Sequence, residues 1–292
     1  MDIVNLGKKN LLFKPMQHLD FIDLHFHANP DLYVRKHHVT GASNEYKKLN
    51  GGVLFQNHLG YTGSLDTLGN VMDSLILNHV AGGINYKNVE RILQSRSQEK
   101  PNKLLVIFPN ITGRKHVSKL KRNISHEKWL DAAFVPEVLS QNGRLLQKTK
   151  DLIQFAKDQP IVLASGHASK EEIYLLAEEC YKIGLNKLLV TQPSNPMTDI
   201  LGEEMLLLSK NFDFLYFEQT ALTYLLGYET WENFEFVVKN VEKLIYTSDL
   251  GQTTQISIPE WFELSQKWFS TMSLSPQRIK DITKNNPLNL IL

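Results

Sequence analysis

Short apolar runs recur along the chain and predict the strands of a parallel sheet. Near-continuous apolar runs of four to eight residues are typical of strands that are covered on both faces. Eight runs of this kind lie between helical stretches: FIDLHFH (21–27), GGVLFQNH (51–58), DSLILNHV (73–80), KLLVIFPN (103–110), PIVLASGH (160–167), NKLLVTQP (186–193), FDFLYFEQ (212–219) and KLIYTSD (243–249). Eight is the strand number of a closed β/α barrel.

The segments between these runs carry apolar residues at every third or fourth position, which predicts helices over residues 86–98, 136–158, 169–184 and 198–211. Ser169 and Glu172 have the spacing of a capping box, so we expect a helix to start just after His167. Trp and Phe stripes in 231–240 and 259–269 are typical of helix faces that pack on a core. On outer helices such stripes could also mark the surface of a homo-oligomer.

Polar residues gather at the ends of the predicted strands. They are His25, His27, His58, His79, His167, Gln192, Glu218 and Asp249. In α/β barrels the active site is built at the carboxyl ends of the strands, although a doubly wound sheet also gathers ligands there. We therefore predict an α/β fold, a (β/α)8 TIM-type barrel in which residues 1–292 form one domain, with the doubly wound sheet as the alternative.

Charge and cysteine content narrow the choice of partners. Lysine plus arginine (32) nearly balances aspartate plus glutamate (31), so we expect small-molecule substrates rather than nucleic acid or a membrane. Cys180 is the only cysteine, and a helical segment surrounds it, which predicts a packing role in a reducing compartment. The first residues show no basic segment followed by a long apolar run, so the expected location is the cytoplasm.

The first predicted strand contains three residues that can bind a metal or take part in catalysis. Asp23, His25 and His27 alternate with Leu24 and Phe26, and alternate side chains of a strand share one face. Two imidazoles on one face can converge on a metal ion. The alternative is that both histidines of a half-buried strand bond only to backbone groups or water.

The order of DLHFH near the N-terminus, SGH at a middle strand, TSD at a late strand and a closing ITKNNPLNLIL resembles the amidohydrolase-like superfamily of metal-dependent hydrolases. The resemblance extends from about residue 20 to the C-terminus and implies a barrel fold. It implies that His25 and His27 match the paired histidines of the first strand, His167 the histidine of the fifth and Asp249 the aspartate of the eighth. Such a set holds one divalent transition metal, for which zinc is our first expectation.

Two positions depart from the binuclear members of that superfamily. Gln56 stands where those members supply a bridging carboxylated lysine, and Gln192 stands where they supply a sixth-strand histidine. The expected centre is therefore mononuclear. In the implied mechanism a metal-bound water attacks a carbonyl-type carbon, Asp249 acts as general base and then acid, and Gln192 or His58 donates a hydrogen bond to the developing oxyanion.

Basic residues in two loops suggest an anionic substrate. The loop at 35–38 supplies Arg35 and the loop at 110–116 supplies Arg114 and Lys115, although the first loop could be only a solvated charge run. Glu218 at the end of the seventh run is a candidate substrate contact or, alternatively, a buried glutamate paired with one of these basic groups. The predicted function is hydrolysis of an amide, ester or lactone of a small, anionic substrate. The alternatives are a catalytically inactive ligand-binding barrel and a metal-dependent phosphoesterase.

Overall fold

A computed structural model describes residues 16–63, 70–96, 100, 102–114, 119–126, 128 and 130–292. The strands are β1 (Phe21–Phe26), β2 (Gly51–Phe55), β3 (Val71–Met72), β4 (Ser74–Ile76), β5 (Leu104–Ile107), β6 (Ser140–Gln141), β7 (Arg144–Leu145), β8 (Ile161–Ala164), β9 (Leu188–Val190), β10 (Leu215–Thr220) and β11 (Leu244–Thr247). The α-helices are α1 (Val39–Lys48), α2 (Tyr86–Ser95), α3 (Leu130–Ala133), α4 (Gln147–Ala156), α5 (Lys170–Ile183), α6 (Gly202–Asn211), α7 (Ala221–Leu225), α8 (Trp231–Asn240), α9 (Ile258–Thr271), α10 (Pro276–Lys280) and α11 (Asn286–Ile291). The described residues also include a 3-10 turn, η2 (His79–Ala81), and a π-helical turn, η4 (Asp281–Asn285).

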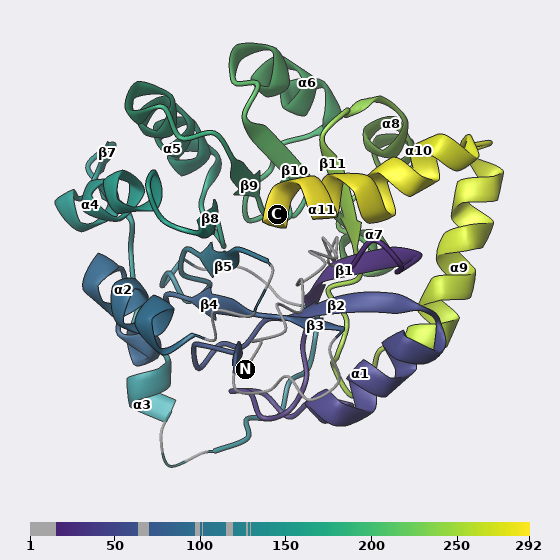
Figure 1. The fold of residues 1–292 in the computed structure, drawn as a ribbon, viewed down its shortest axis with the longest axis horizontal. Coiled ribbons are helices and arrows are strands. Elements are labelled where there is room, and N and C mark those ends of the chain that lie inside the picture. Colours follow the sequence, from purple (N-terminus) through teal and green to yellow (C-terminus); the bar gives the residue numbers. More distant parts are fainter. Residues whose placement is uncertain are drawn as a thin grey trace, which may run out of the picture.

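Two parallel sheets form the centre of the molecule, and helices surround them (Figure 1). One sheet has the order β1-β2-β3 and the other the order β11-β10-β9-β8-β5-β4. The sheets meet at both edges: Asp73 alone separates β3 from β4, and Phe26 pairs with Leu250, just after β11. The predicted α/β class with parallel strands is confirmed.

Two apolar layers hold this arrangement together. Alternate strand residues such as Leu24, Leu54, Leu105 and Ile245 pack with one another in an apolar cluster between the two sheets, which is called the inner cluster below. The other residues of the same strands pack outward against the helices. Each strand of the two parallel sheets is therefore buried on both faces, which is why these strands appear in the sequence as near-continuous apolar runs.

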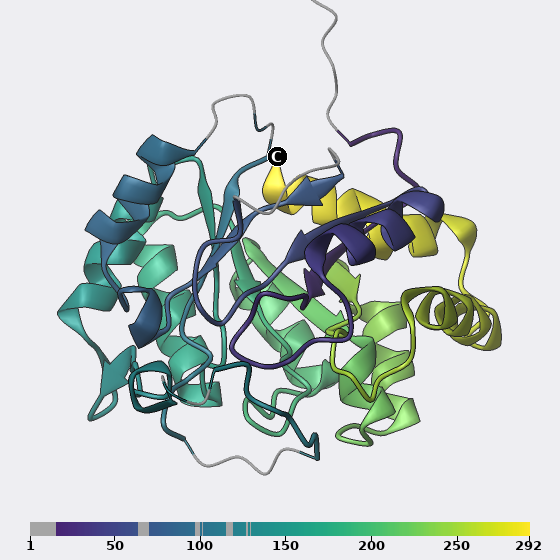
Figure 2. The ribbon, with the colours of Figure 1, turned by 90° about the horizontal axis from the view of Figure 1, so that it is seen from below.

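The C-terminal helix α11 lies over one end of the two sheets (Figure 2). Leu288, Leu290 and Ile291 join the inner apolar cluster, and Ile291 accepts a backbone hydrogen bond from Lys103, which precedes β5. This is the amino end of the strands. The opposite end, where the carboxyl ends of the strands lie, is not covered by α11.

Several predicted boundaries need correction. The helix predicted over 136–158 begins only at Gln147, because β6 and β7 form a hairpin turning at Asn142-Gly143. Both turn residues have positive φ (51° and 71°), which an Asn-Gly pair adopts readily. The capping box of Ser169 and Glu172 is confirmed at the start of α5. His79, predicted at a strand end, lies in η2 with 54% of its side chain exposed.

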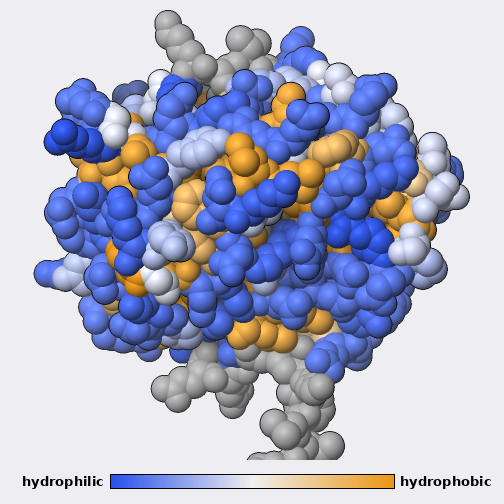
Figure 3. Space-filling view, turned by 90° about the horizontal axis from the view of Figure 1, so that it is seen from above, coloured by the Kyte–Doolittle hydropathy of each residue, from blue (hydrophilic) through white to orange (hydrophobic). Residues whose placement is uncertain are grey.

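The aromatic stripes belong to the core. Phe234 of α8 and Trp261 and Phe269 of α9 are buried against the strands, as is Cys180 of α5, where burial raises the thiol pKa to about 12. The face over α5, α6 and α8 is mostly hydrophilic, with apolar side chains exposed between polar ones (Figure 3). No helix among the described residues combines the length and apolar character needed to cross a membrane. The homo-oligomer stays a prediction.

Candidate metal and substrate site

His25 and His27 face a cavity at the carboxyl end of β1, where the strand changes register. Pairing with β2 shifts between Asp23 and Phe26. Leu24 faces the inner cluster and His25, the next residue, faces the cavity together with His27, so the strict alternation of faces is broken within this interval. A register irregularity of this kind commonly re-aims a side chain next to an active site.

The prediction that Asp23 shares the face of the two histidines is wrong. Its Oδ2 accepts a hydrogen bond of 2.5 Å from Tyr46 of α1, and its Oδ1 accepts one from the backbone N of Ser248. Burial raises the pKa of Asp23 to about 6, against these hydrogen bonds, which lower it. Asp23 therefore ties β1 to α1 and to the end of β11, away from the cavity.

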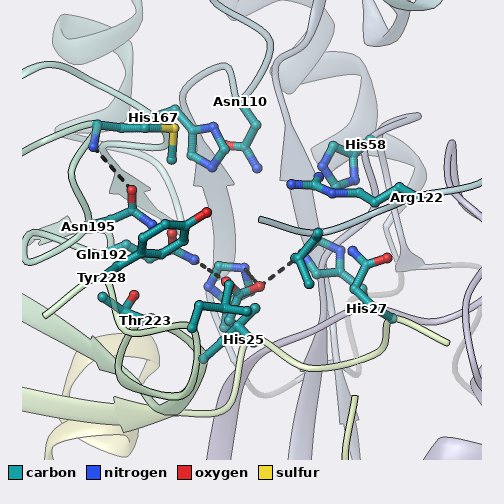
Figure 4. A pocket seen from close by; sticks show the side chains of 16 residues that line it. His25, His27, His58, Asn110, Arg122, His167, Gln192, Asn195, Thr223 and Tyr228 are labelled. Atoms are coloured by element: carbon teal, nitrogen blue, oxygen red, sulfur yellow. Dashed lines mark hydrogen bonds and ion pairs between the residues drawn. The ribbon is translucent and has the colours of Figure 1, made fainter. Parts of the chain in front are cut away.

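Both imidazoles turn their Nε2 atoms toward one oxygen of Asp249. The distances to Asp249 Oδ1 are 3.3 Å from His25 Nε2 and 3.6 Å from His27 Nε2. Figure 4 labels the two histidines and marks interactions of this kind with dashed lines. Asp249 and Gln192 both have positive φ (52° and 46°), and Gln192 Nε2 donates to Asp249 Oδ2 at 2.6 Å. Residues held in sparsely populated backbone regions cluster at functional sites.

The opposite ring nitrogens are fixed by acceptors. His25 Nδ1 lies 3.0 Å from Glu218 Oε1, and His27 Nδ1 lies 2.9 Å from the carbonyl oxygen of Gln56. Metal-binding histidines commonly donate Nδ1–H to a carboxylate or carbonyl, which leaves Nε2 as the ligand atom. Glu218, predicted as a substrate contact, is instead 1% exposed and orients His25.

The three groups titrate differently. Burial lowers the pKa of His25, but Asp249 and Glu218 raise it more, to about 9. Burial and the nearby charge of Arg35 hold the pKa of His27 well below its usual value. Burial also raises the pKa of Asp249, although the charge of His25 opposes this. In the metal-free protein at neutral pH, the His25 ring is therefore a protonated imidazolium that carries hydrogen on both nitrogens.

A second cluster adjoins the first. Asp31 Oδ2 lies 2.5 Å from Arg35 Nη2 and 3.1 Å from His58 Nδ1, and Asp31 Oδ1 accepts from the backbone N of His58. The His58 ring stacks on His27 with centroids 5.0 Å apart. Arg35, predicted to grip an anionic substrate, has a fully buried guanidinium and lines neither of the cavities described below. Its charge instead neutralises Asp31.

Two adjoining cavities open above these clusters. The inner one, with a volume of about 60 Å³, reaches His25, His27 and Asp249. The outer one, of about 640 Å³, lies beyond it. Seven residues line both: His58, Asn110, Arg122, His167, Asn195, Met197 and Tyr228. The two cavities therefore form one continuous recess.

His167 faces this recess from the turn after β8. Gly166 has a φ of 58°, and a Cβ there would collide with the carbonyl oxygen of Phe108, so only glycine allows the chain to turn at this point. Among the described residues, His25, His27 and Asp249 have ligand atoms within 4.8 Å of one another, and His167 is not one of this group. Its role as a metal ligand stays a prediction.

The basic residues of the two loops are only partly where the sequence suggested. Arg114 lines the outer cavity, but it bonds to Glu172 and to the carbonyl oxygen of His167. Lys115 lies outside the described residues. Gln192 and His58 line the inner cavity, and the amide of Gln192 is already engaged by Asp249.

Sequence reasoning missed several residues of this site. They are Asp31, which bonds to His58 behind the recess, and Asn110, Arg122, Asn195 and Tyr228, which line it. Asp31 could have been identified, because it closes the HFHANPD segment and lies four residues after His27. The other four come from loops, whose path into the recess no local pattern predicts.

Residues 20–215 match the family described as "Family of unknown function (DUF6282)". The match spans more than half of the chain, so the protein belongs to this family. None of the curated proteins matches the sequence.

Two solved structures are similar to this chain. An uncharacterized TIM-barrel protein from Bordetella bronchiseptica is 10% identical, with a TM-score of 0.50 over 85% of this chain and 80% of its own. A probable 2-pyrone-4,6-dicarboxylic acid hydrolase from Acinetobacter baumannii is 13% identical, with a TM-score of 0.47 over 93% of this chain and 99% of its own. The first likeness supports the TIM-barrel class for the fold; the activity named for the second belongs to that protein.

Proposed function

We propose that this protein is a metal-dependent hydrolase built on a closed (β/α)8 barrel. The observation that carries the proposal is the convergence of His25 Nε2 and His27 Nε2 on Asp249 Oδ1 at the floor of a recess. Backbone bonds join β1 to the segment after β11, from His27 N to Leu250 O and from Asp249 N to His25 O, and they support the closure.

The donor set fits a divalent transition metal. Two imidazole nitrogens and one carboxylate oxygen lie within 4.8 Å of one another, and both Nδ1 atoms have acceptors that leave Nε2 for the metal. His25, His27 and Asp249 would hold the metal, with His167 as the expected fourth ligand. Imidazole-rich sites favour zinc, iron or nickel over magnesium. When bound, such a metal would supply Lewis-acid activation of water near neutral pH.

Asp249 is our choice for the general base. Its Oδ1 faces the two imidazoles, whereas its Oδ2 accepts a hydrogen bond from Gln192 and can hold the proton that water loses. Its raised pKa, caused mainly by burial, favours this role. Gln192 then acts as a positioning residue that fixes the carboxylate, rather than as the oxyanion donor that the sequence suggested.

His58 fits a different role from the predicted one. Nδ1 lies 3.1 Å from the carboxylate of Asp31 and 3.3 Å from Arg35 Nη2, which can only donate. We assign the proton to Nδ1 because the contact with the carboxylate is the shorter one, and burial lowers the pKa of the ring. A neutral imidazole that donates from Nδ1 offers only an acceptor at Nε2. We therefore propose that His58 accepts a hydrogen bond from the substrate or its attacking water.

The test begins with metal content. Protein purified without chelator should contain about one zinc ion per chain by elemental analysis. His25→Ala should lose it, whereas His79→Ala, which changes an exposed histidine outside the group, should keep it. Two ions per chain would place a second site at His58. No bound metal after zinc is added would refute the hydrolase and favour the inactive ligand-binding barrel.

Turnover is tested next with Asp249→Asn. Asparagine keeps an oxygen for the metal but cannot accept a proton, and such proton transfer typically contributes about 10²- to 10⁴-fold to the rate. A panel of esters, lactones, amides and phosphoesters should therefore give a substrate that the zinc-loaded protein cleaves and the variant cleaves about 10²- to 10⁴-fold more slowly. Equal rates for the two proteins would remove Asp249 from the mechanism.

A further inference from the structure

The outer cavity is large enough to hold the part of a substrate that does not react. Its volume of about 640 Å³ compares with about 60 Å³ for the inner cavity. Because seven residues line both, a ligand whose reactive group sits beside His25 and Asp249 can extend into the outer cavity. The lining of that cavity would then contact the part of the substrate that does not react.

The charged residues of this lining are cationic. Among the described residues that line the outer cavity, Arg114 and Arg122 are the arginines, and aspartate and glutamate are absent. Arg114 is engaged by Glu172 and lines the outer cavity only. Arg122 lines both cavities, on the side of His58 and opposite Asn195 and Tyr228 (Figure 4). Its position lets it contact a ligand that spans the two.

Aromatic contacts hold Arg122 in place. Its Cζ lies 4.9 Å from the ring centroid of Tyr33, a cation–π distance. The Tyr33 ring in turn packs edge-on against His58, with centroids 5.3 Å apart, and lies 6.2 Å from the ring of Phe134. A guanidinium that is positioned before binding loses little side-chain entropy when it pairs with an anion.

The rest of the outer lining is largely apolar. Ile111, Phe134, Pro196 and Met197 contribute side chains without charge or hydrogen-bonding groups. Phe134 is half-buried, so part of its ring is open to a ligand. A planar or aliphatic hydrocarbon body would bury apolar surface there, while an attached anion would reach Arg122.

We infer that the outer cavity binds a carboxylic acid, with the carboxylate on Arg122 and the apolar body against Phe134 and Met197. The fork of a guanidinium matches a carboxylate with two parallel hydrogen bonds. We choose a carboxylate over a phosphate because Glu172 already compensates the second arginine, which leaves less cationic charge for a dianion. The inference rests on the proposed function in taking the inner cavity as the reaction site.

The experiment compares benzoate with benzamide, two ligands of similar shape that differ in charge. Calorimetric titration of the full chain, as purified and again after chelator treatment, should show benzoate binding at least tenfold tighter than benzamide. Arg122→Gln should weaken benzoate about tenfold and leave benzamide within about twofold, the scale of one charge-assisted hydrogen-bonded pair. Arg122→Lys, which keeps the charge without the fork, should fall between.

The matched control is Arg91→Gln, which removes an exposed arginine of α2 that lines neither cavity. It should leave both affinities unchanged. Unchanged benzamide binding in Arg122→Gln shows that the cavity remains folded, so a loss confined to benzoate reports the missing guanidinium. Higher salt should weaken benzoate more than benzamide, because an ion pair at a half-exposed site is screened.

Three outcomes would overturn the inference. They are equal binding of benzoate and benzamide by the unaltered protein, benzoate binding that Arg122→Gln leaves intact, and phenyl phosphate binding at least tenfold tighter than benzoate. The chelator-treated arm makes this failure distinguishable from failure of the proposed function. Protein that takes up no zinc but binds benzoate through Arg122 would refute the hydrolase and keep the carboxylate site.

Discussion

Replacing Glu218 with glutamine tests whether this buried carboxylate prepares His25 to bind metal. Its two oxygens accept from three donors: His25 Nδ1 at 3.0 Å, Thr247 Oγ1 at 3.0 Å and the backbone N of Gln192 at 3.1 Å. A glutamine side chain has one oxygen and one NH₂ group, so in either orientation the NH₂ group meets a donor. Glu218→Gln therefore removes the negative charge beside His25 in either orientation, together with the bonds at Oε1 (His25 and Thr247) or the bond at Oε2 (Gln192), without changing the shape of the site.

The expected magnitude follows from these contacts. Loss of an outer-shell partner typically costs about 10- to 100-fold in metal affinity, or about 1.4 to 2.7 kcal/mol. One buried donor left without its acceptor should also lower the free energy of unfolding of the metal-free protein by about 1 to 3 kcal/mol. The affinity loss should be largest near pH 9. At pH 7 it should shrink, because Glu218 helps to raise the pKa of His25 and removing its charge weakens proton competition.

The assay is competition between the protein and a chromophoric chelator for zinc, from pH 6.5 to 9, together with urea unfolding without metal. Glu229→Gln is the matched control. Glu229 is also a largely buried carboxylate, bonded to Gln219 and Asn233, and it lines neither cavity. It should affect stability and not zinc affinity. A zinc affinity of Glu218→Gln within twofold of the unaltered protein at pH 9 would refute this account of His25.

Two further predictions concern protons. Since the pKa of His25 is raised to about 9, zinc uptake at pH 7 should release its proton, and zinc affinity should rise with pH up to about 9. Calorimetry in buffers of different ionisation enthalpy counts that proton, and a count that stays the same at pH 7 and pH 9.5 would contradict the assignment. Tyr46→Phe should lower the free energy of unfolding by about 1 to 3 kcal/mol at pH 8, because Asp23 is then a buried carboxylate that loses a donor. The loss should be smaller at pH 5, below the folded pKa of about 6, where Asp23 is protonated; an equal loss in urea unfolding at both pH values would exclude this cause.

Local patterns in the sequence determined the parallel α/β class and predicted where a site would lie. Strands buried on both faces must be apolar throughout, so their positions could be read directly, and polar residues at their ends predicted a site at the carboxyl ends of the strands. His25, His27 and Asp249 were found in this way. The capping box of Ser169 and Glu172 was also predictable, because it depends on residues three apart.

The tertiary structure alone decided which polar groups meet. Strand alternation predicted Asp23 beside His25, but the register shift in β1 separates them, and such a shift depends on pairing with β2. Arg35 is buried in an ion pair with Asp31, and Glu218 accepts a hydrogen bond from His25. Arg122 reaches the recess from a loop. Each of these outcomes depends on contacts between segments far apart in the sequence or on the path of a loop, which hydrophobic periodicity does not encode.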